Sequence, residues 1–319
     1  MDQAERLRSI VKQKSENETE EQIIDSIVKA VENTENQVKK EEKKAKVITV
    51  TSGKGGVGKS SVSINLAIQL KKRGREVIIF DADFGLANIE VMFGAIPKYT
   101  LADLMLQGKE INEIICEGPE GVMFVSGGSG IAKLGDLDKE EVRRLVGKLS
   151  ELDSLADVII VDTGAGISSS VLEFVAASPE VILVATLEPT SITDSYALLK
   201  ALSMFEGFDK DSTKIMLLGN RTLSVNDGPN MYEKLSSVVE KFLKFKLEYL
   251  GCIPSDEFVV KAIMKQSPVV NAYPSASAAK AYEQVMNKLM GVDEPISTAK
   301  EKRGIGNFFS SILRHNKKN

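Results

Sequence analysis

The sequence has no tryptophan, two cysteines and one histidine among its 319 residues. Cys116 and Cys252 lie far apart, so the chain offers neither a disulfide framework nor a CxxC pair for a metal or an iron–sulfur cluster. This cysteine usage is typical of a protein in the reducing cytosol. The histidine, His315, lies close to the C-terminus and is not expected to be catalytic.

Long apolar runs are absent as well. No stretch approaches the roughly 20 residues that a bilayer-spanning helix needs. The first residues, MDQAERLRSI, are charged and lack the apolar segment of a signal peptide. We therefore expect a protein that is made and kept in the cytoplasm. Aromatic residues make up 6% and apolar residues 43% of the chain, which predicts a mainly aliphatic core.

Charge is unevenly distributed along the chain. The net charge is −4, but residues 1–46 carry −1 and residues 299–319 carry +5, which leaves −8 on residues 47–298. An acidic body argues against direct nucleic-acid binding. Any contact with an anionic surface is therefore expected at the basic tail.

Residues 1–46 form an extension that contains neither glycine nor proline. Two short amphipathic helices are predicted within it, because apolar residues recur there at helical spacing. Neither apolar stripe is wide enough to build a domain. The stripes consist of Ala4, Leu7 and Val11, and of Ile24, Ile27, Val28 and Val31.

Residues 47–298 read as an α/β domain with a doubly wound, mostly parallel sheet. Seven apolar, β-rich runs begin near residues 47, 76, 122, 157, 181, 214 and 248, and helical patterns lie between most of them. Helices are predicted over 62–75, 139–152 and 195–205. Ligands of such sheets bind at the carboxyl ends of the strands. The predicted strands end in Ser52, Asp81, Asp162 and Asn220.

The segment GKGGVGKS, residues 53–60, matches the phosphate-loop pattern G-x-x-x-x-G-K-[ST]. Lys59 is placed to reach the β- and γ-phosphates of a nucleotide, and the Ser60 hydroxyl to bind Mg²⁺. The alternative is a flexible glycine-rich turn. A predicted strand before the segment and a predicted helix after it favour a nucleotide site.

Acidic residues at two strand ends support this site. Asp81 and Asp83 occur in IIFDADFGLANIE, and Asp162 occurs in IIVDTGAG. A carboxylate at such a position steadies Mg²⁺ through its water shell, and the N–H of Gly166 is placed to meet the γ-phosphate. Any one of these aspartates alone is better explained as a turn cap, but three beside a phosphate loop indicate a site.

The stretches SGKGGVGKSS, DADFGLANIE and DTGAG resemble the deviant phosphate loop and the two switches of MinD/ParA-type ATPases, over residues 47 to about 290. The resemblance implies slow, Mg²⁺-dependent ATP hydrolysis by a dimer that forms with ATP. Lys54 holds the position of the family's hallmark lysine, which crosses the dimer interface to the other subunit's phosphates. The alternative for Lys54 is a solvated loop lysine.

The resemblance also assigns roles within the site. Asp83 is expected to orient the attacking water, and Asp81 and Asp162 to hold the Mg²⁺ shell. Asn220 is expected to contact the adenine edge, with Arg221 beside it and Asp256 flanking the base. The expected nucleotide-binding loop residues are Gly53, Gly55, Gly56, Val57, Gly58, Lys59, Ser60 and Ser61.

DQAERLR, residues 2–8, resembles the N-terminal signature of the FlhG group of flagellar number and placement regulators, and SGGSGIAKL, residues 126–134, also resembles that group. This implies that Gln3, Leu7 and Arg8 engage an FlhF-type GTPase and stimulate it, with flagellar C-ring components as further partners. One alternative for this stretch is an ordinary amphipathic helix, and one for the protein is a MinD-like division-site regulator. Another is a nucleotide-stabilised adaptor whose hydrolysis is incidental.

Residues 299–319 are predicted to form a basic membrane-targeting tail. Apolar residues recur there at helical spacing between basic flanks, which is typical of a helix lying on an anionic membrane surface. Two tails on an ATP-bound dimer gain roughly 10²-fold or more in avidity, so the dimer is expected on the inner face of the cell membrane. The alternative is a terminal helix packed on the body. The apolar residues are Ile305, Phe308, Phe309, Ile312 and Leu313.

Overall fold

The computed structural model describes residues 44–83, 88–128, 139–291 and 304–315. The chain divides into two units, residues 1–43 and residues 44–319, and all of the described residues belong to the second. Gln3, Leu7, Arg8 and both predicted N-terminal helices therefore lie outside the described residues.

Eight strands form one sheet in the order β3-β4-β2-β5-β1-β6-β7-β8. Every neighbouring pair is parallel except β3 and β4. This confirms the predicted α/β fold class and all seven predicted strands. The strand that the sequence did not reveal, β3, has three residues, too few to show a pattern. The bounds are β1 Lys46–Ser52, β2 Val77–Ala82, β3 Ile115–Glu117, β4 Met123–Ser126, β5 Val158–Ala165, β6 Glu180–Ala185, β7 Lys214–Thr222 and β8 Leu247–Pro254.

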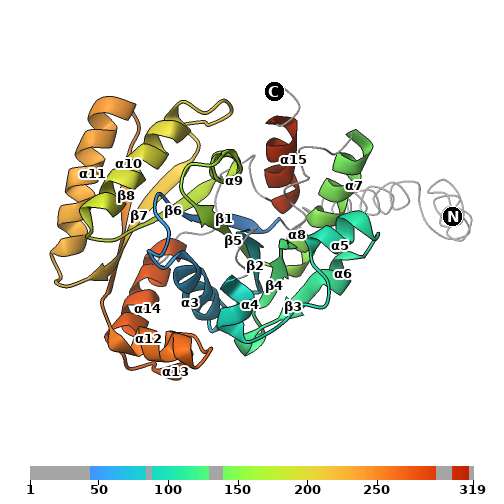
Figure 1. Ribbon diagram of the computed structural model, residues 1–319, viewed down its shortest axis with the longest axis horizontal. Helices are drawn as coiled ribbons and strands as arrows, with labels where there is room; N and C mark the ends of the chain where they lie inside the picture. Colours follow the sequence, from blue (N-terminus) through green and yellow to red (C-terminus); the bar gives the residue numbers. More distant parts are fainter. Residues whose placement is uncertain (1–43, 84–87, 129–138, 292–303, 316–319) are drawn as a thin grey trace, which may run out of the picture. The chain divides into compact units, whose positions relative to one another are not determined.

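Helices cover both faces of the sheet (Figure 1). One face carries α3 Lys59–Lys71, α4 Asn88–Phe93, α12 Glu257–Met264, α13 Val269–Ala272 and α14 Ser277–Met290. The other carries α5 Leu101–Leu106, α6 Ile111–Ile114, α7 Lys139–Ser150, α8 Leu152–Leu155, α9 Ser169–Ala177, α10 Pro189–Ser203, α11 Asp227–Leu243 and α15 Ile305–His315. None of the helices in these ranges has the length and apolar content needed to span a bilayer.

The two covered faces explain why the strands are apolar throughout. Ile48 and Val50 of β1 belong to the core on the α3 side, whereas Val47 belongs to the core on the opposite side. In β2, Ile79 and Phe80 divide in the same way. Successive side chains of a strand point to opposite faces, so a strand between two helical layers needs apolar residues at every position.

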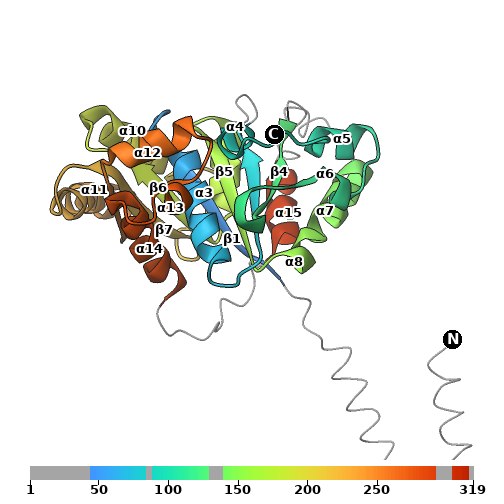
Figure 2. The ribbon, with the colours of Figure 1, turned by 90° about the horizontal axis from the view of Figure 1, so that it is seen from below.

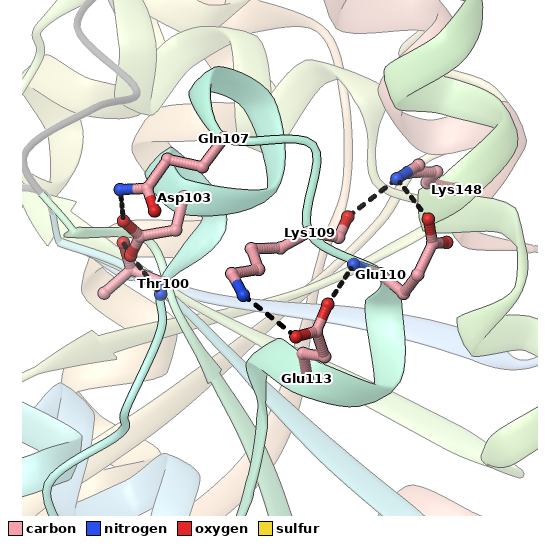
Figure 3. A network of polar contacts seen from close by, with 7 residues as sticks. All are labelled: Thr100, Asp103, Gln107, Lys109, Glu110, Glu113 and Lys148. Atoms are coloured by element: carbon pink, nitrogen blue, oxygen red, sulfur yellow. Dashed lines mark hydrogen bonds and ion pairs between the residues drawn. The ribbon is translucent and has the colours of Figure 1, made fainter.

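Polar contacts attach the segment between β2 and β4 to helix α7 (Figure 3). The Lys148 ammonium of α7 donates to the Lys109 carbonyl oxygen at 2.7 Å and to the Glu110 carboxylate at 3.1 Å. Within the segment, Asp103 accepts the backbone N–H of Thr100 at the start of α5. The bonds of Lys148 hold the start of α6 beside α7, and the bond of Asp103 caps α5.

The predicted C-terminal helix forms, but its apolar face is packed on the body. Ile305, Phe308, Phe309 and Ile312 are each at most 2% exposed. The Phe309 ring lies 5.2 Å from that of Phe80, centroid to centroid. The alternative of a packed terminal helix is therefore the arrangement observed, and α15 lies beside α7 (Figure 2). The side chain of Leu313 lies outside the described part.

Candidate nucleotide site

The phosphate loop connects β1, a central strand of the sheet, to α3. Gly56 and Gly58 adopt positive φ angles of 76° and 98°, which side chains rarely allow. Gly53 is needed for a different reason: a Cβ at this position would lie 2.2 Å from the backbone carbonyl of Asp194 in α10. The loop therefore depends on glycine both for its backbone conformation and for its close approach to α10.

Lys59 is the first residue of α3 and is 8% exposed. Burial lowers the pKa of its ammonium, and the nearby charges of Asp162 and Asp83 oppose that effect. The first turn of α3 contains no acidic residue, and no side chain caps it. Its backbone N–H groups and its positive helix end therefore suit the binding of an anion such as a phosphate.

Asp81 lies one residue before the end of β2, Asp162 lies within β5, and the two are directly opposite each other in the β2–β5 register. Asp162 accepts a hydrogen bond from the Ser60 hydroxyl at 2.6 Å and another from the Ser63 hydroxyl at 2.8 Å. The structure thus brings together three expected magnesium-site residues, Ser60, Asp81 and Asp162, from three separate parts of the sequence. Ser63 was not anticipated, although it lies one helical turn after Ser60.

Both carboxyl groups are perturbed by their surroundings. Burial, strengthened by the charge of Asp162, raises the pKa of Asp81 to about 8. Burial also raises the pKa of Asp162 to about 6, against the hydrogen bonds from Ser60 and Ser63. A bound cation stabilises the charged form of two buried carboxyl groups. Mg²⁺ prefers oxygen ligands and keeps several waters. Among the described residues, no three His, Cys, Asp or Glu side chains are arranged to hold a metal ion. The oxygen atoms of Ser60, Asp81 and Asp162 fit a hydrated Mg²⁺ that is shared with phosphates.

Asp83 lies where β2 leaves the sheet. Its backbone N–H donates to Asp81 at 3.0 Å, and its carboxylate accepts from the Asn88 amide of α4 at 3.4 Å. A Cβ on Gly164 would lie 3.7 Å from the Asp83 carboxylate. Asp83 is therefore beside the end of β5 and faces the segment that leads to Gly166.

Two residues that are expected to contact the nucleotide also form hydrogen bonds within the protein. The N–H of Gly166 donates to the carbonyl oxygen of Ser52 at 3.0 Å. The amide nitrogen of Asn220 donates to the carbonyl oxygen of Val57 at 2.7 Å, and its amide oxygen accepts the N–H of Arg221. Asn220 is 6% exposed, and its bond to Val57 holds the phosphate loop.

The remaining expected residues have structural contacts of their own. Asp256 caps α12 by accepting the N–H of Phe258 and also accepts the N–H of Ala278 in α14. Ser61 is 8% exposed and shares a hydrogen bond with the buried Tyr282. These contacts join the loop and its neighbouring helices to the core, which the sequence pattern did not reveal.

Lys54 has contacts separate from those of Lys59. Its ammonium forms an ion pair with Glu188 and donates to the Thr190 hydroxyl at 2.7 Å, both at the start of α10. Its side chain is 33% exposed. Glu188 lies 134 residues away in sequence, so nothing in the loop motif indicated this pairing. The two lysines of one loop therefore lie in different environments, one buried and one at the surface.

Comparisons with known proteins agree with this geometry. The ParA family model, described as NUBPL iron-transfer P-loop NTPase, matches residues 43–290. The chain is 44% identical to antiactivator FleN of Pseudomonas aeruginosa, covering 76% of this chain and 85% of the relative. It is 34% identical to the flagellum site-determining protein YlxH of Helicobacter pylori, covering 85% and 90%.

Solved structures give the same result for the fold. MinD of Pyrococcus horikoshii, complexed with Mg-ADP, has 25% identity and a TM-score of 0.61, covering 79% of this chain and 100% of that one. MinD of Aquifex aeolicus has 23% identity and a TM-score of 0.62, covering 80% and 100%. The chain belongs to the ParA/MinD family of P-loop NTPases and is an ATPase related to the flagellar regulators FleN and YlxH.

Proposed function

We propose that this protein is an ATP-switched, dimerising ATPase that regulates the number or placement of flagella. Identity of 44% to FleN, against 29% to the septum site-determining protein MinD of Helicobacter pylori, favours the flagellar role. The observation that carries the switching mechanism is that the two lysines of the phosphate loop lie in different environments. Lys59 is buried beside the acidic strand ends, and Lys54 lies at the surface.

The loop N–H groups, the start of α3 and Lys59 bind the phosphates of ATP. Ser60, with Asp162 and Asp81 behind it, would hold Mg²⁺ and its waters, and the ion would neutralise phosphate charge. Asp83 orients the attacking water at the edge of this site. Because its amide is already engaged, Asn220 contributes by fixing the loop, with Arg221 and Asp256 near the base.

Lys54 acts on the other subunit's nucleotide. To do so it exchanges Glu188 for phosphate oxygens across the dimer interface. Exposed ion pairs contribute only about 0–1 kcal/mol, so the contact with Glu188 is a small barrier beside a charge-assisted phosphate contact. Bound ATP then links the two subunits of the dimer, and its hydrolysis lets them separate.

Partners bind at the two ends of the chain and on the body. Gln3, Leu7 and Arg8 engage an FlhF-type GTPase and stimulate it, and flagellar C-ring components contact the body. The apolar face of α15 leaves the body in the dimer and binds the inner face of the cell membrane, so the protein moves between the cytoplasm and the membrane.

The proposal is tested by measuring hydrolysis with anionic vesicles and the partner GTPase present, for the wild type and for Asp83→Ala. We expect slow hydrolysis that the variant loses while it still binds ATP. Partner function that survives unchanged without hydrolysis supports the alternative of a nucleotide-stabilised adaptor. Recovery of division proteins rather than flagellar proteins in pull-downs supports a MinD-like role.

A further inference from the structure

Helix α15 is held on the body by one carboxylate as well as by its apolar face. Asp153 lies in α8, and its Oδ1 accepts the backbone N–H of Ile305 at 2.8 Å. The same oxygen accepts the N–H of Ala45, just before β1, at 3.2 Å. A carboxylate at the first turn of a helix is stabilised by unpaired N–H groups and by the positive helix end. We call these contacts of Asp153 with Ala45 and Ile305 the Asp153 clasp.

Two glycines let the first turn approach the clasp closely. Gly304 has a φ of 107°, and a Cβ at this position would lie 2.7 Å from Oδ2 of Asp153. A Cβ on Gly306 would lie 2.1 Å from the hydroxyl oxygen of Ser150 at the end of α7. The N–H of Gly304 also donates to the carbonyl oxygen of Ala45 at 3.1 Å. This fit is specific to the sequence around residue 304 and is not a general property of an amphipathic helix.

The apolar face beyond the clasp rests on elements that carry site residues. Phe309 contacts Phe80, which immediately precedes Asp81 in β2. Phe308 lies 5.7 Å, centroid to centroid, from Phe174 of α9, which follows the segment containing Gly166. The helix is thus clasped at its first turn, and its aromatic side chains rest on β2 and α9.

We propose that the Asp153 clasp is the release point of α15, and that opening it frees the apolar face of the helix for a lipid surface. The inference rests on the proposed membrane role of α15 and deepens it by naming the contact that restrains the helix. Because Oδ1 of Asp153 also holds Ala45, the clasp joins α15 to the point where residues 1–43 enter the body. A displaced Ala45 withdraws one of the three backbone N–H donors of this carboxylate, which come from Ala45, Ile305 and Gly306.

Two variants of the full chain disturb the clasp from opposite sides. Asp153→Asn keeps the shape and an acceptor oxygen but removes the charge, and Gly304→Ala presses a methyl group onto the same carboxylate. Asp227→Asn is the matched control, because Asp227 accepts the N–H groups of Leu223 and Ser224 at the start of α11, which packs in a separate core from α15. Nucleotide affinity shows whether each variant keeps its fold.

The measurement is amide hydrogen exchange of residues 305–312 without nucleotide or lipid. A lost charge-assisted bond corresponds to exchange roughly tenfold faster or more in both clasp variants, with no change in the control. Wild-type exchange rates in both folded clasp variants overturn the proposal.

Co-sedimentation with anionic phospholipid vesicles separates the clasp from the membrane role. We expect Asp153→Asn to bind vesicles without ATP, and Phe308→Asp added to it to remove that binding. Faster exchange without any vesicle binding supports the clasp and contradicts the membrane role in the proposed function.

Discussion

At the scale of single residues, the fold alters the protonation of Asp81 and Asp162 most clearly. Burial raises the pKa of both, to about 8 and about 6. Lys59 is buried beside them, and burial lowers its pKa. Burial therefore disfavours the charged form of all three groups, and a bound nucleotide and a cation are expected to stabilise those charged forms.

Asp81 predicts a pH dependence of stability. An unfolded aspartate has a pKa of about 3.9, so between about pH 4 and 8 the folded protein keeps a proton that the unfolded chain has released. Folding stability therefore falls as the pH rises through this window, by at most about 1.4 kcal/mol per pH unit. We expect Asp81→Asn to remove this contribution, measured by urea unfolding between pH 5 and 8 with EDTA and without nucleotide. Identical pH slopes for the two proteins contradict the prediction.

Asn220 gives a second prediction. Because its amide holds Val57 rather than standing free, Asn220→Ala should loosen the phosphate loop and weaken every nucleotide. A lost buried hydrogen bond of about 1–1.5 kcal/mol lowers affinity roughly 5- to 12-fold. We expect ADP and GDP affinities, measured by calorimetry, to fall by the same factor. A selective loss of ADP affinity shows instead that Asn220 recognises adenine.

Residue identities could be predicted from the sequence where a short motif carries them. Lys59, Ser60 and the glycines follow from one eight-residue pattern. The bonds from Asn220 to Val57 and from Lys54 to Glu188 could not, because each partner is more than 130 residues away. Contacts of this kind are set by the strand order, which no local pattern encodes.

At the scale of elements, helix α15 shows how far a sequence pattern predicts the position of a helix. Its apolar stripe was visible in the sequence, and the helix formed where the stripe lies. Spacing shows that a helix has an apolar face but does not show what covers it. The contacts with Phe80 and Phe174 and the Asp153 clasp are long-range, so the packed position was predicted only as an alternative.

The packing of α15 predicts non-additive mutations. Phe308→Ala and Phe309→Ala each remove a buried aromatic ring, which costs about 3–5 kcal/mol in a fixed core. A terminal helix can leave the body as a unit, so neither the single variants nor the double variant can lose more than its docking free energy. We expect the double variant to be no less stable in urea than the worse single variant.

A distant pair provides the control. Phe309→Ala combined with Leu235→Ala, in the separate core around α11, should destabilise by the sum of the two single effects. If the Phe308 and Phe309 effects also add fully, α15 unfolds only with the whole body, and ready release of the helix is contradicted.

At the scale of the whole molecule, the nucleotide site lies at the central strands β1, β2 and β5, and α15 lies on the opposite face of the sheet from α3 (Figure 1). Lys54 alone among the loop lysines is at the surface, and its ammonium binds the start of α10. We therefore propose that one subunit suffices to bind the nucleotide, whereas the switch requires two subunits.

The most direct test of this account compares Lys59→Ala with Lys54→Ala, both in an Asp83→Ala background that blocks turnover. Lys59→Ala removes a charge-assisted contact of roughly 1.5–3 kcal/mol, so the ATP affinity of the single chain should fall about 10-fold or more. Lys54→Ala should leave that affinity nearly unchanged and abolish the ATP-dependent dimer. Calorimetry gives the affinity and light scattering gives the molar mass. A Lys54→Ala chain that still dimerises with ATP, or that loses ATP affinity as severely as Lys59→Ala, contradicts the account.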